Sequence, residues 1–167
     1  MELYLLRHGE AGKRLPMSSR DMDRDLTEAG KEEIKEVGEG LVGLGLKFDI
    51  VASSPLKRAK ETASIVNREL KRKAPVEEWS ELSPEGRRDA LYRRLGRLRA
   101  GTSVLCVGHE PYLTTAIAEL VDRGQSTGVR IVLKKGGLAR LSLTGGGSKL
   151  AGELRWLLTP RQIRKMA

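Results

Sequence analysis

Two short apolar runs in this chain each end at one of its only two histidines. Residues 3–6 lead into Arg7 and His8, and residues 104–107 lead into Gly108 and His109. Each run has the length and composition of a buried strand that stops at a polar turn, and buried strands of this kind are typical of parallel sheets. Parallel α/β sheets bind their ligands at the edge where the strands end. The sequence therefore predicts an α/β fold that brings both histidines to one edge of a sheet.

The rest of the chain alternates expected strands and expected helices. Strands are predicted over 2–7, 48–52, 75–79, 103–107, 129–133, 137–143 and 153–158, with a turn at 145–147 before the last one. Helices are predicted from Thr27 as N-cap, from Ser54-Pro55 as N-cap and first-turn proline to about residue 71, from Pro84 through an arginine-rich stretch, and from Pro111 to about residue 121. This order favours one domain over residues 1–167. Its expected architecture is a three-layer α/β/α sandwich with a mostly parallel central sheet and antiparallel edge strands late in the chain.

Composition excludes several classes of protein. No run reaches eighteen apolar residues, so no membrane span is predicted, and residues 3–6 are too short for the apolar core of a signal peptide. Cys106 is the only cysteine, so disulfides are not expected in the fold. These features together favour a cytoplasmic location.

The formal net charge of +9 has several readings: a nucleic-acid site, an acidic protein partner, an anionic small substrate or a basic solvated surface. Aromatic residues make up only 4% of the chain, which leaves few platforms for stacking bases and makes nucleic acid an unlikely partner. The basic residues cluster along one predicted helix and near the end of the chain, and a solvated helix face is the simplest interpretation. The first cluster contains Arg87, Arg88, Arg93, Arg94, Arg97 and Arg99.

The residues at the predicted sheet edge have the chemistry of a phosphoryl-transfer site. A neutral imidazole such as that of His8 attacks phosphorus well when its other ring nitrogen is held protonated by a fixed acceptor. The planar guanidinium groups of Arg7 and Arg58 match pairs of phosphate oxygens. His109 lies where a helix is expected to begin, so free backbone N–H groups add to an anion site. Metal binding is a weaker interpretation, because there is no HxH spacing or nearby cysteine and the arginines repel a cation.

Four motifs in order resemble those of the histidine phosphatase superfamily, also called the phosphoglycerate mutase-like family. They are Leu5-Leu6-Arg7-His8-Gly9-Glu10-Ala11, Leu26-Thr27-Glu28-Ala29-Gly30, the segment 53–62 (SSPLKRAKET) and Gly108-His109-Glu110-Pro111. The resemblance implies a phosphoglycerate mutase-like fold in which His8 is transiently phosphorylated. It also implies a phosphate pocket formed by Arg7, Arg58 and His109, a contact from Arg24 to the phosphate or its carrier, and no need for a metal or other cofactor.

Within that superfamily the chain looks most like the SixA-type phosphohistidine phosphatases. The likeness lies in its short length, in the stretch from Glu81 to Pro84 and in the spacing from Trp156 to Pro160. It implies a phosphohistidine-carrying protein as substrate, either a phosphorelay domain or a phosphocarrier domain.

A general acid is the least defined part of the site. Larger superfamily members carry a glutamate in an inserted lid, but only about 50 residues separate Arg58 from His109 here, and Glu81 and Glu85 are the candidates. Cleavage of a phosphoramidate expels imidazole, which takes a proton from water, so a phosphohistidine substrate needs a positioned acid less than an alkyl phosphate does. Two alternatives stay open. One is a phosphatase or mutase acting on a small phosphate ester, and the other is a basic binding module without catalysis.

Overall fold

The computed structural model describes residues 1–12, 22–122, 130–146 and 150–167 of the chain. Within these stretches one mixed sheet has the strand order β3-β2-β4-β1-β5-β6. Its strands are β1 (Glu2–Arg7), β2 (Ile50–Ser53), β3 (Glu77–Glu78), β4 (Ser103–Gly108), β5 (Leu138–Thr144) and β6 (Ala151–Leu158). The strands β3, β2, β4 and β1 run parallel, whereas β5 and β6 are antiparallel to their neighbours. The predicted sheet, with its late antiparallel strands, is confirmed.

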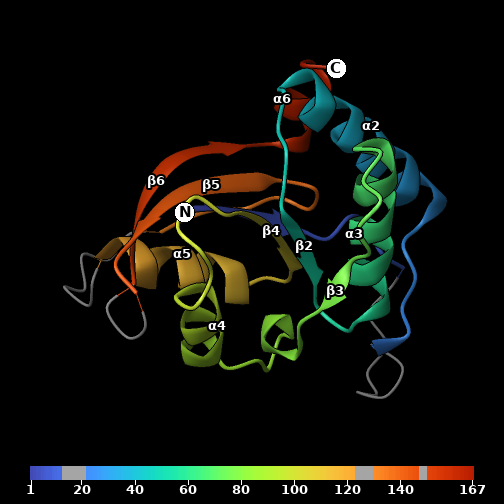
Figure 1. The fold of residues 1–167 in the computed structure, drawn as a ribbon. Helices are drawn as coiled ribbons and strands as arrows, with labels where there is room; N and C mark the ends of the chain where they lie inside the picture. Colours follow the sequence, from blue (N-terminus) through green and yellow to red (C-terminus); the bar gives the residue numbers. More distant parts are fainter. Residues whose placement is uncertain (13–21, 123–129, 147–149) are drawn as a thin grey trace.

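Helices cover both faces of this sheet, which gives the predicted three layers (Figure 1). They are α2 (Glu28–Gly43), α3 (Lys57–Glu69), the 3₁₀ helix η1 (Ser80–Leu82), α4 (Arg88–Leu95), α5 (Tyr112–Asp122) and α6 (Pro160–Arg164). One buried cluster joins α2, α3 and α6 to one face of the sheet, and a second joins η1, α4 and α5 to the other face. The two clusters share the central strands β1 and β4, whose side chains alternate between the two faces.

The register of the parallel strands places their carboxyl ends side by side. Arg7 at the end of β1 lies opposite Gly108 at the end of β4, and Ser53 at the end of β2 lies opposite Val107. The backbone continues this pairing one step further, because His8 N donates to the Gly108 carbonyl at 3.1 Å and Ser54 N donates to the Val107 carbonyl at 3.0 Å. Three strand-to-helix turns therefore meet at one edge of the sheet.

The structure corrects the prediction of a strand over 129–133. Residues 130–133 have no regular secondary structure, and Val129 lies outside the described residues. Both sides of β1 are already paired, with β4 and β5, so this apolar stretch has no free edge of β1 to join. Its Leu133 carbonyl instead accepts a hydrogen bond from Arg7 Nη1 at 2.9 Å.

Two helix starts also differ from their predictions. The helix expected to begin at Ser54-Pro55 begins at Lys57, with Leu56 at the N-cap position and no side-chain cap. The Ser54 hydroxyl instead accepts from the backbone N–H of Leu56 within the turn. The arginine-rich helix begins at Arg88 rather than at Pro84, because Pro84 and Glu85 form a turn after η1 and residues 86–87 have no regular secondary structure. Thr27 does cap α2 as predicted, accepting from Gly30 N at 3.0 Å.

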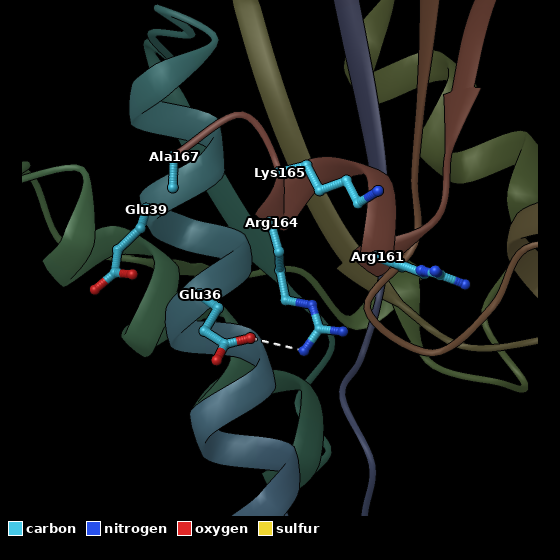
Figure 2. Close-up of a pocket in the computed structure, with 6 residues that line it drawn as sticks. All are labelled: Glu36, Glu39, Arg161, Arg164, Lys165 and Ala167. Atoms are coloured by element: carbon cyan, nitrogen blue, oxygen red, sulfur yellow. Dashed lines mark hydrogen bonds and ion pairs between the residues drawn. The ribbon is translucent and has the colours of Figure 1, made fainter.

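A short helix after β6 was not predicted. Thr159 and Gln162 form a reciprocal capping box at the start of α6, and the helix packs against α2. Gly40 in α2 leaves room for the backbone of Ile163, where any Cβ would collide. Arg164 Nη1 lies 2.7 Å from Glu36 Oε2 and ties the two helices together on the surface (Figure 2). Among the described residues, no helix combines the length and apolar character needed to cross a membrane.

Candidate active site

The carboxyl edge of the sheet brings together the four residues predicted to form the phosphoryl site. Arg7 ends β1 and His8 follows it, Arg58 lies in the first turn of α3, and His109 follows β4. The centroids of the His8 and His109 imidazole rings are 5.1 Å apart with the ring planes tilted by 54°, and Arg58 Nε lies 3.3 Å from His8 Nε2. Both imidazoles and the Arg58 side chain are buried. Two imidazoles and a guanidinium group therefore share one buried site.

The hydrogen bonds of His8 define which of its ring nitrogens can react. Its Nδ1 lies 2.7 Å from the Gly9 carbonyl oxygen, which only accepts hydrogen bonds, so Nδ1 carries a proton. The Nε2 lone pair then accepts from Arg58 Nε–H. A neutral imidazole held in this tautomer presents Nε2 as a nucleophile, which is the arrangement expected from the sequence.

The surroundings of His8 keep its imidazole neutral. Burial is the main reason that the pKa of His8 falls from 6.5 to about 4, and the hydrogen bond to Gly9 opposes the shift. The positive charges of Arg58, Arg7 and Arg24 lower this pKa further. His8 is therefore unprotonated at neutral pH, so its Nε2 lone pair is available without prior loss of a proton.

Gly9 lacks a side chain at the place where the turn after His8 meets α2. A Cβ at this position would lie 2.6 Å from Cγ1 of Ile34 in α2, so the missing side chain lets the His8 turn pack against that helix. The backbone N–H of Gly9 donates to Thr62 Oγ1 at 3.1 Å, and the Thr62 hydroxyl donates to the Arg58 carbonyl at 2.7 Å. Thr62 thus joins the turn that carries His8 to the helix that carries Arg58.

Arg7 is held by the backbone of the stretch that precedes β5. Its Nη1 donates to the Leu133 carbonyl at 2.9 Å, and the backbone of the 134–137 turn packs against it, since Gly136 N donates to the Arg7 carbonyl at 3.0 Å. The buried Arg7 Nε has no hydrogen-bond partner among the described residues. The guanidinium group is therefore anchored through one nitrogen and keeps donors for a ligand.

His109 is fixed through a residue that the sequence analysis did not single out. Its Nε2 lies 2.8 Å from Ser54 Oγ, whereas its buried Nδ1 has no hydrogen-bond partner among the described residues. Burial is again the main cause that lowers the pKa, here to about 2, with further contributions from His8 and the arginines. Its carbonyl accepts from Leu113 N at 2.9 Å, so His109 precedes the first turn of α5, as expected.

The other three predicted residues lie in different surroundings. Arg24 donates from Nη1 to the Gly12 carbonyl at 3.0 Å, and its charge lowers the pKa of both histidines. Glu81 lies in η1, and its Oε1 accepts from Arg94 Nε at 2.9 Å. Glu85 is exposed in the turn before α4. The structure therefore joins Glu81 to the arginine-rich helix, and the roles of all three remain predictions.

Sequence reasoning also missed Glu110, which directly follows His109. Its carboxylate is half-buried and accepts from the Thr114 hydroxyl at 2.6 Å, and burial raises its pKa. The available signal was its place in the motif Gly108-His109-Glu110-Pro111. Similarly, Ser54 and Thr62 lie within the segment 53–62, and the four-residue spacing of Arg58 and Thr62 indicates neighbours on one helix face.

Two cavities lie away from the histidine pair. One, of about 440 Å³, is lined by Glu81 and residues of α4 and its extension, namely Ala90, Arg93, Arg94, Arg97 and Leu98. The other, of about 430 Å³, lies between α2 and α6 and is lined by Glu36, Glu39, Arg161, Arg164, Lys165 and Ala167 (Figure 2). Neither includes a residue of the predicted phosphoryl site. In the part of the chain that the structure describes, no three His, Cys, Asp or Glu side chains gather as a metal site.

The fold and the paired histidines at the strand ends define a class of α/β protein. Its site is buried and positively charged, which suits an anionic ligand. Comparison with known proteins identifies the family. The model of the histidine phosphatase superfamily (branch 1) matches residues 3–84, and the chain belongs to this superfamily. An uncharacterized protein of Picosynechococcus sp. (strain PCC 7002) is 36% identical over 98% of this chain and 99% of its own length.

Two further similarities bear on activity. The structure of the protein histidine phosphatase SixA complexed with tungstate superposes with a TM-score of 0.83 and 26% identity, over 96% of this chain and 98% of that one. A 2,3-bisphosphoglycerate-dependent phosphoglycerate mutase of Parvibaculum lavamentivorans is 41% identical, but only over 41% of this chain and 33% of its own length. The superfamily and the SixA likeness indicate a phosphatase.

Proposed function

We propose that this protein is a metal-independent phosphatase that removes phosphate from phosphohistidine on another protein, through a phosphorylated His8 intermediate. The observation that carries the proposal is the state of His8. Its Nδ1–H is committed to the Gly9 carbonyl, which leaves Nε2 as a neutral nucleophile beside Arg58, and the ring centroids of His8 and His109 are 5.1 Å apart. A dianionic phosphoryl group that enters this site meets fixed positive charges, which stabilise its oxygens during transfer.

The proposed reaction has two steps. In the first, His8 Nε2 forms a bond to phosphorus while the bond between phosphorus and the substrate imidazole breaks, and the departing imidazole takes a proton from water. In the second, water attacks phosphorus, inorganic phosphate leaves and His8 returns to its neutral state. Arg7, Arg58 and His109 donate to the phosphoryl oxygens in both steps, and Arg24 adds positive charge.

The segment between Arg58 and His109 supports a protein substrate. The whole interval is described, and it consists of α3, β3, η1, α4, β4 and their connections, with no inserted lid domain. A site without such a lid admits a histidine displayed on a folded protein, whereas a small phosphate ester gains more from enclosure. The ion pair between Glu81 and Arg94 points the same way, because it directs this carboxylate toward the arginine-rich helix α4.

The second candidate is a phosphatase or mutase for a small phosphate ester. The local similarity to phosphoglycerate mutases favours it. This activity uses the same phosphate site but needs a general acid for the alkoxide leaving group.

Single-turnover hydrolysis in the presence of a chelator tests the proposal. A phosphohistidine-carrying phosphocarrier or phosphorelay domain is compared with 4-nitrophenyl phosphate, and the enzyme is analysed by mass spectrometry at alkaline pH, where phosphohistidine survives. We expect a phosphoryl adduct on His8, faster turnover of the protein substrate, and loss of both in a folded His8→Ala variant. An adduct with turnover of small esters alone supports the second candidate. A folded protein with no adduct and no turnover overturns both, leaving the basic binding module as the better reading.

A further inference from the structure

The Ser54 hydroxyl lies at the centre of a small buried hydrogen-bond network beside His109. Ser54 is fully buried in the turn between β2 and α3, and its backbone N–H is bonded to the neighbouring strand β4. Its Oγ lies 2.8 Å from His109 Nε2 and accepts from the backbone N–H of Leu56 at 3.3 Å. The hydroxyl is therefore held from two sides and contacts only one side chain in this network, the imidazole of His109.

A count of hydrogens assigns the direction of the bond between Ser54 and His109. A serine hydroxyl has one hydrogen to donate, and a neutral imidazole has one protonated and one unprotonated nitrogen. Leu56 N–H already points at the Ser54 oxygen, so the hydroxyl hydrogen needs an acceptor elsewhere. If His109 Nε2 carried the proton, two donors would meet the same oxygen and the buried hydroxyl hydrogen would lose its acceptor. Donation from Ser54 Oγ–H to Nε2 satisfies the hydroxyl hydrogen, the hydroxyl oxygen and Nε2 together.

The direction of this hydrogen bond determines whether Nδ1 of His109 carries a proton. When Nε2 accepts from Ser54, the single ring proton of the neutral imidazole lies on Nδ1. That nitrogen is buried and has no hydrogen-bond partner among the described residues, and its ring centroid lies 5.1 Å from that of His8. An Nδ1–H donor is suited to a phosphoryl oxygen, whereas the opposite tautomer would turn a lone pair toward the anion.

We propose that Ser54 is a positioning residue that holds His109 in the Nδ1–H tautomer, so that the imidazole donates to a phosphoryl oxygen without first taking up a proton. The proposed role rests on the phosphate-binding function of His109. Arg7, Arg24 and Arg58 disfavour a cationic imidazole, so His109 has to donate while neutral. A neutral imidazole without a fixed partner would populate both tautomers, and Ser54 selects the one that donates from Nδ1. The same tautomer is imposed on His8 by a different group, the Gly9 carbonyl.

Nitrogen-15 NMR of the ring nitrogens tests the tautomer directly. The chain has only two histidines, so a His8→Ala spectrum assigns both sets of signals. In the unmodified protein at pH 7 without ligand, we expect His109 to show a protonated Nδ1 and an unprotonated Nε2. An Nε2–H tautomer or an imidazolium in this spectrum overturns the proposal, whether or not any Ser54 variant folds. The readout needs no substrate, so it stands apart from the test of phosphohistidine hydrolysis.

Two serine variants distinguish a specific effect on the His109 tautomer from the general effect of losing a buried hydroxyl. In Ser54→Ala we expect a mixture of tautomers at His109. In the matched control Ser53→Ala, which removes the neighbouring buried hydroxyl that donates to the Ser54 carbonyl at 2.8 Å, we expect the His109 signals to stay in the Nδ1–H state. Equal changes in both variants would mean that the turn, rather than the Ser54 hydroxyl, sets the tautomer, and would overturn the proposal.

Kinetics with 4-nitrophenyl phosphate supply a second readout. For Ser54→Ala we expect kcat/KM to fall about 10- to 100-fold at pH 7.5, the usual range for loss of a group that orients a site histidine. Ser54→Thr, which keeps a hydroxyl, should recover part of the loss. No recovery in Ser54→Thr would indicate a merely structural role for Ser54.

Discussion

The Thr62 hydroxyl accepts a hydrogen bond from the backbone N–H of Gly9 at 3.1 Å, across the boundary between α3 and the turn that carries His8. The same hydroxyl donates to the Arg58 carbonyl at 2.7 Å, so one buried oxygen couples the positions of two site residues. Fifty-three positions separate Gly9 from Thr62 in the sequence, and this contact exists only because β1 and β2 bring their following turns to the same edge.

Replacement of Thr62 by valine should therefore weaken both the fold and the site. The valine leaves the Gly9 N–H buried without a partner, which costs about 1–3 kcal/mol of unfolding free energy. We also expect kcat/KM to fall, because the Gly9 carbonyl that orients His8 belongs to the released turn. Urea unfolding and phosphatase assays measure the two effects. Thr62→Ser, which keeps the hydroxyl, is the control, and equal losses in both variants would contradict this role of the hydroxyl.

The two buried histidines should make the protein less stable as the pH falls below about 6.5. Both have a lower pKa in the folded state, about 4 for His8 and about 2 for His109, than the 6.5 of an unfolded imidazole. Between these values the unfolded chain binds protons that the folded chain does not, so acid favours unfolding. By pH 5 each histidine accounts for a loss of about 2 kcal/mol relative to neutral pH.

Urea unfolding at pH 7.5 and pH 5.0 measures this dependence. A His109→Asn variant has no imidazole to titrate at that position but keeps all the carboxylates, so its loss of stability over the same interval should be smaller by about 2 kcal/mol. The same loss in the variant and the unmodified protein would show that His109 is not the group responsible.

The sheet edge could be predicted from the sequence because it depends on local patterns. Apolar runs that stop at polar turns placed Arg7, His8 and His109 at the ends of parallel strands, and the structure brings them together with Arg58. Ser54 could not be assigned in the same way. Its hydrogen bond to His109 depends on the register of β2 against β4 and on the rotamer of the Ser54 side chain. A local sequence pattern predicts neither of them.

The errors in the predicted fold have physical causes of the same kind. The apolar residues 131–133 resemble a strand, but both sides of β1 are already paired with other strands. The Leu133 carbonyl instead accepts a hydrogen bond from Arg7. The helix α6 is only five residues long, and its packing against α2 supports it more than its own propensity. The spacing of Thr159 and Gln162 was the one local signal for it.

Loss of the Glu81 carboxylate should have little effect on phosphohistidine hydrolysis. Glu81 is paired with Arg94, and a departing imidazole takes its proton from water, so we expect Glu81→Gln to change kcat/KM for a phosphohistidine protein by less than about threefold. Glu85→Gln, at an exposed position of the same connection, is the matched control. A fall of about 100-fold or more in Glu81→Gln alone would identify Glu81 as a general acid and favour a small phosphate ester as the substrate.

The arginines around the cavity at α4 should speed encounters with an acidic protein substrate. Arg93 and Arg97 both line this cavity, and η1, which also borders it, packs against the end of β4 just before His109. Because Arg93 is paired with Asp89, whereas Arg97 has no ion pair among the described residues, Arg97 offers the more available charge. A phosphohistidine domain with an acidic face would be steered toward the site by this charge.

Arg97→Gln should accordingly lower kcat/KM for the phosphohistidine protein about two- to fivefold at low ionic strength and leave 4-nitrophenyl phosphate hydrolysis unchanged. The difference should shrink at 0.5 M salt, where charges on the surface are screened over a few ångströms. Arg161→Gln removes the same charge from the cavity between α2 and α6 and is the matched control (Figure 2). Equal effects of the two variants would mean that total charge alone attracts the substrate. A loss in Arg97→Gln that persists at high salt would point to a direct contact rather than to steering.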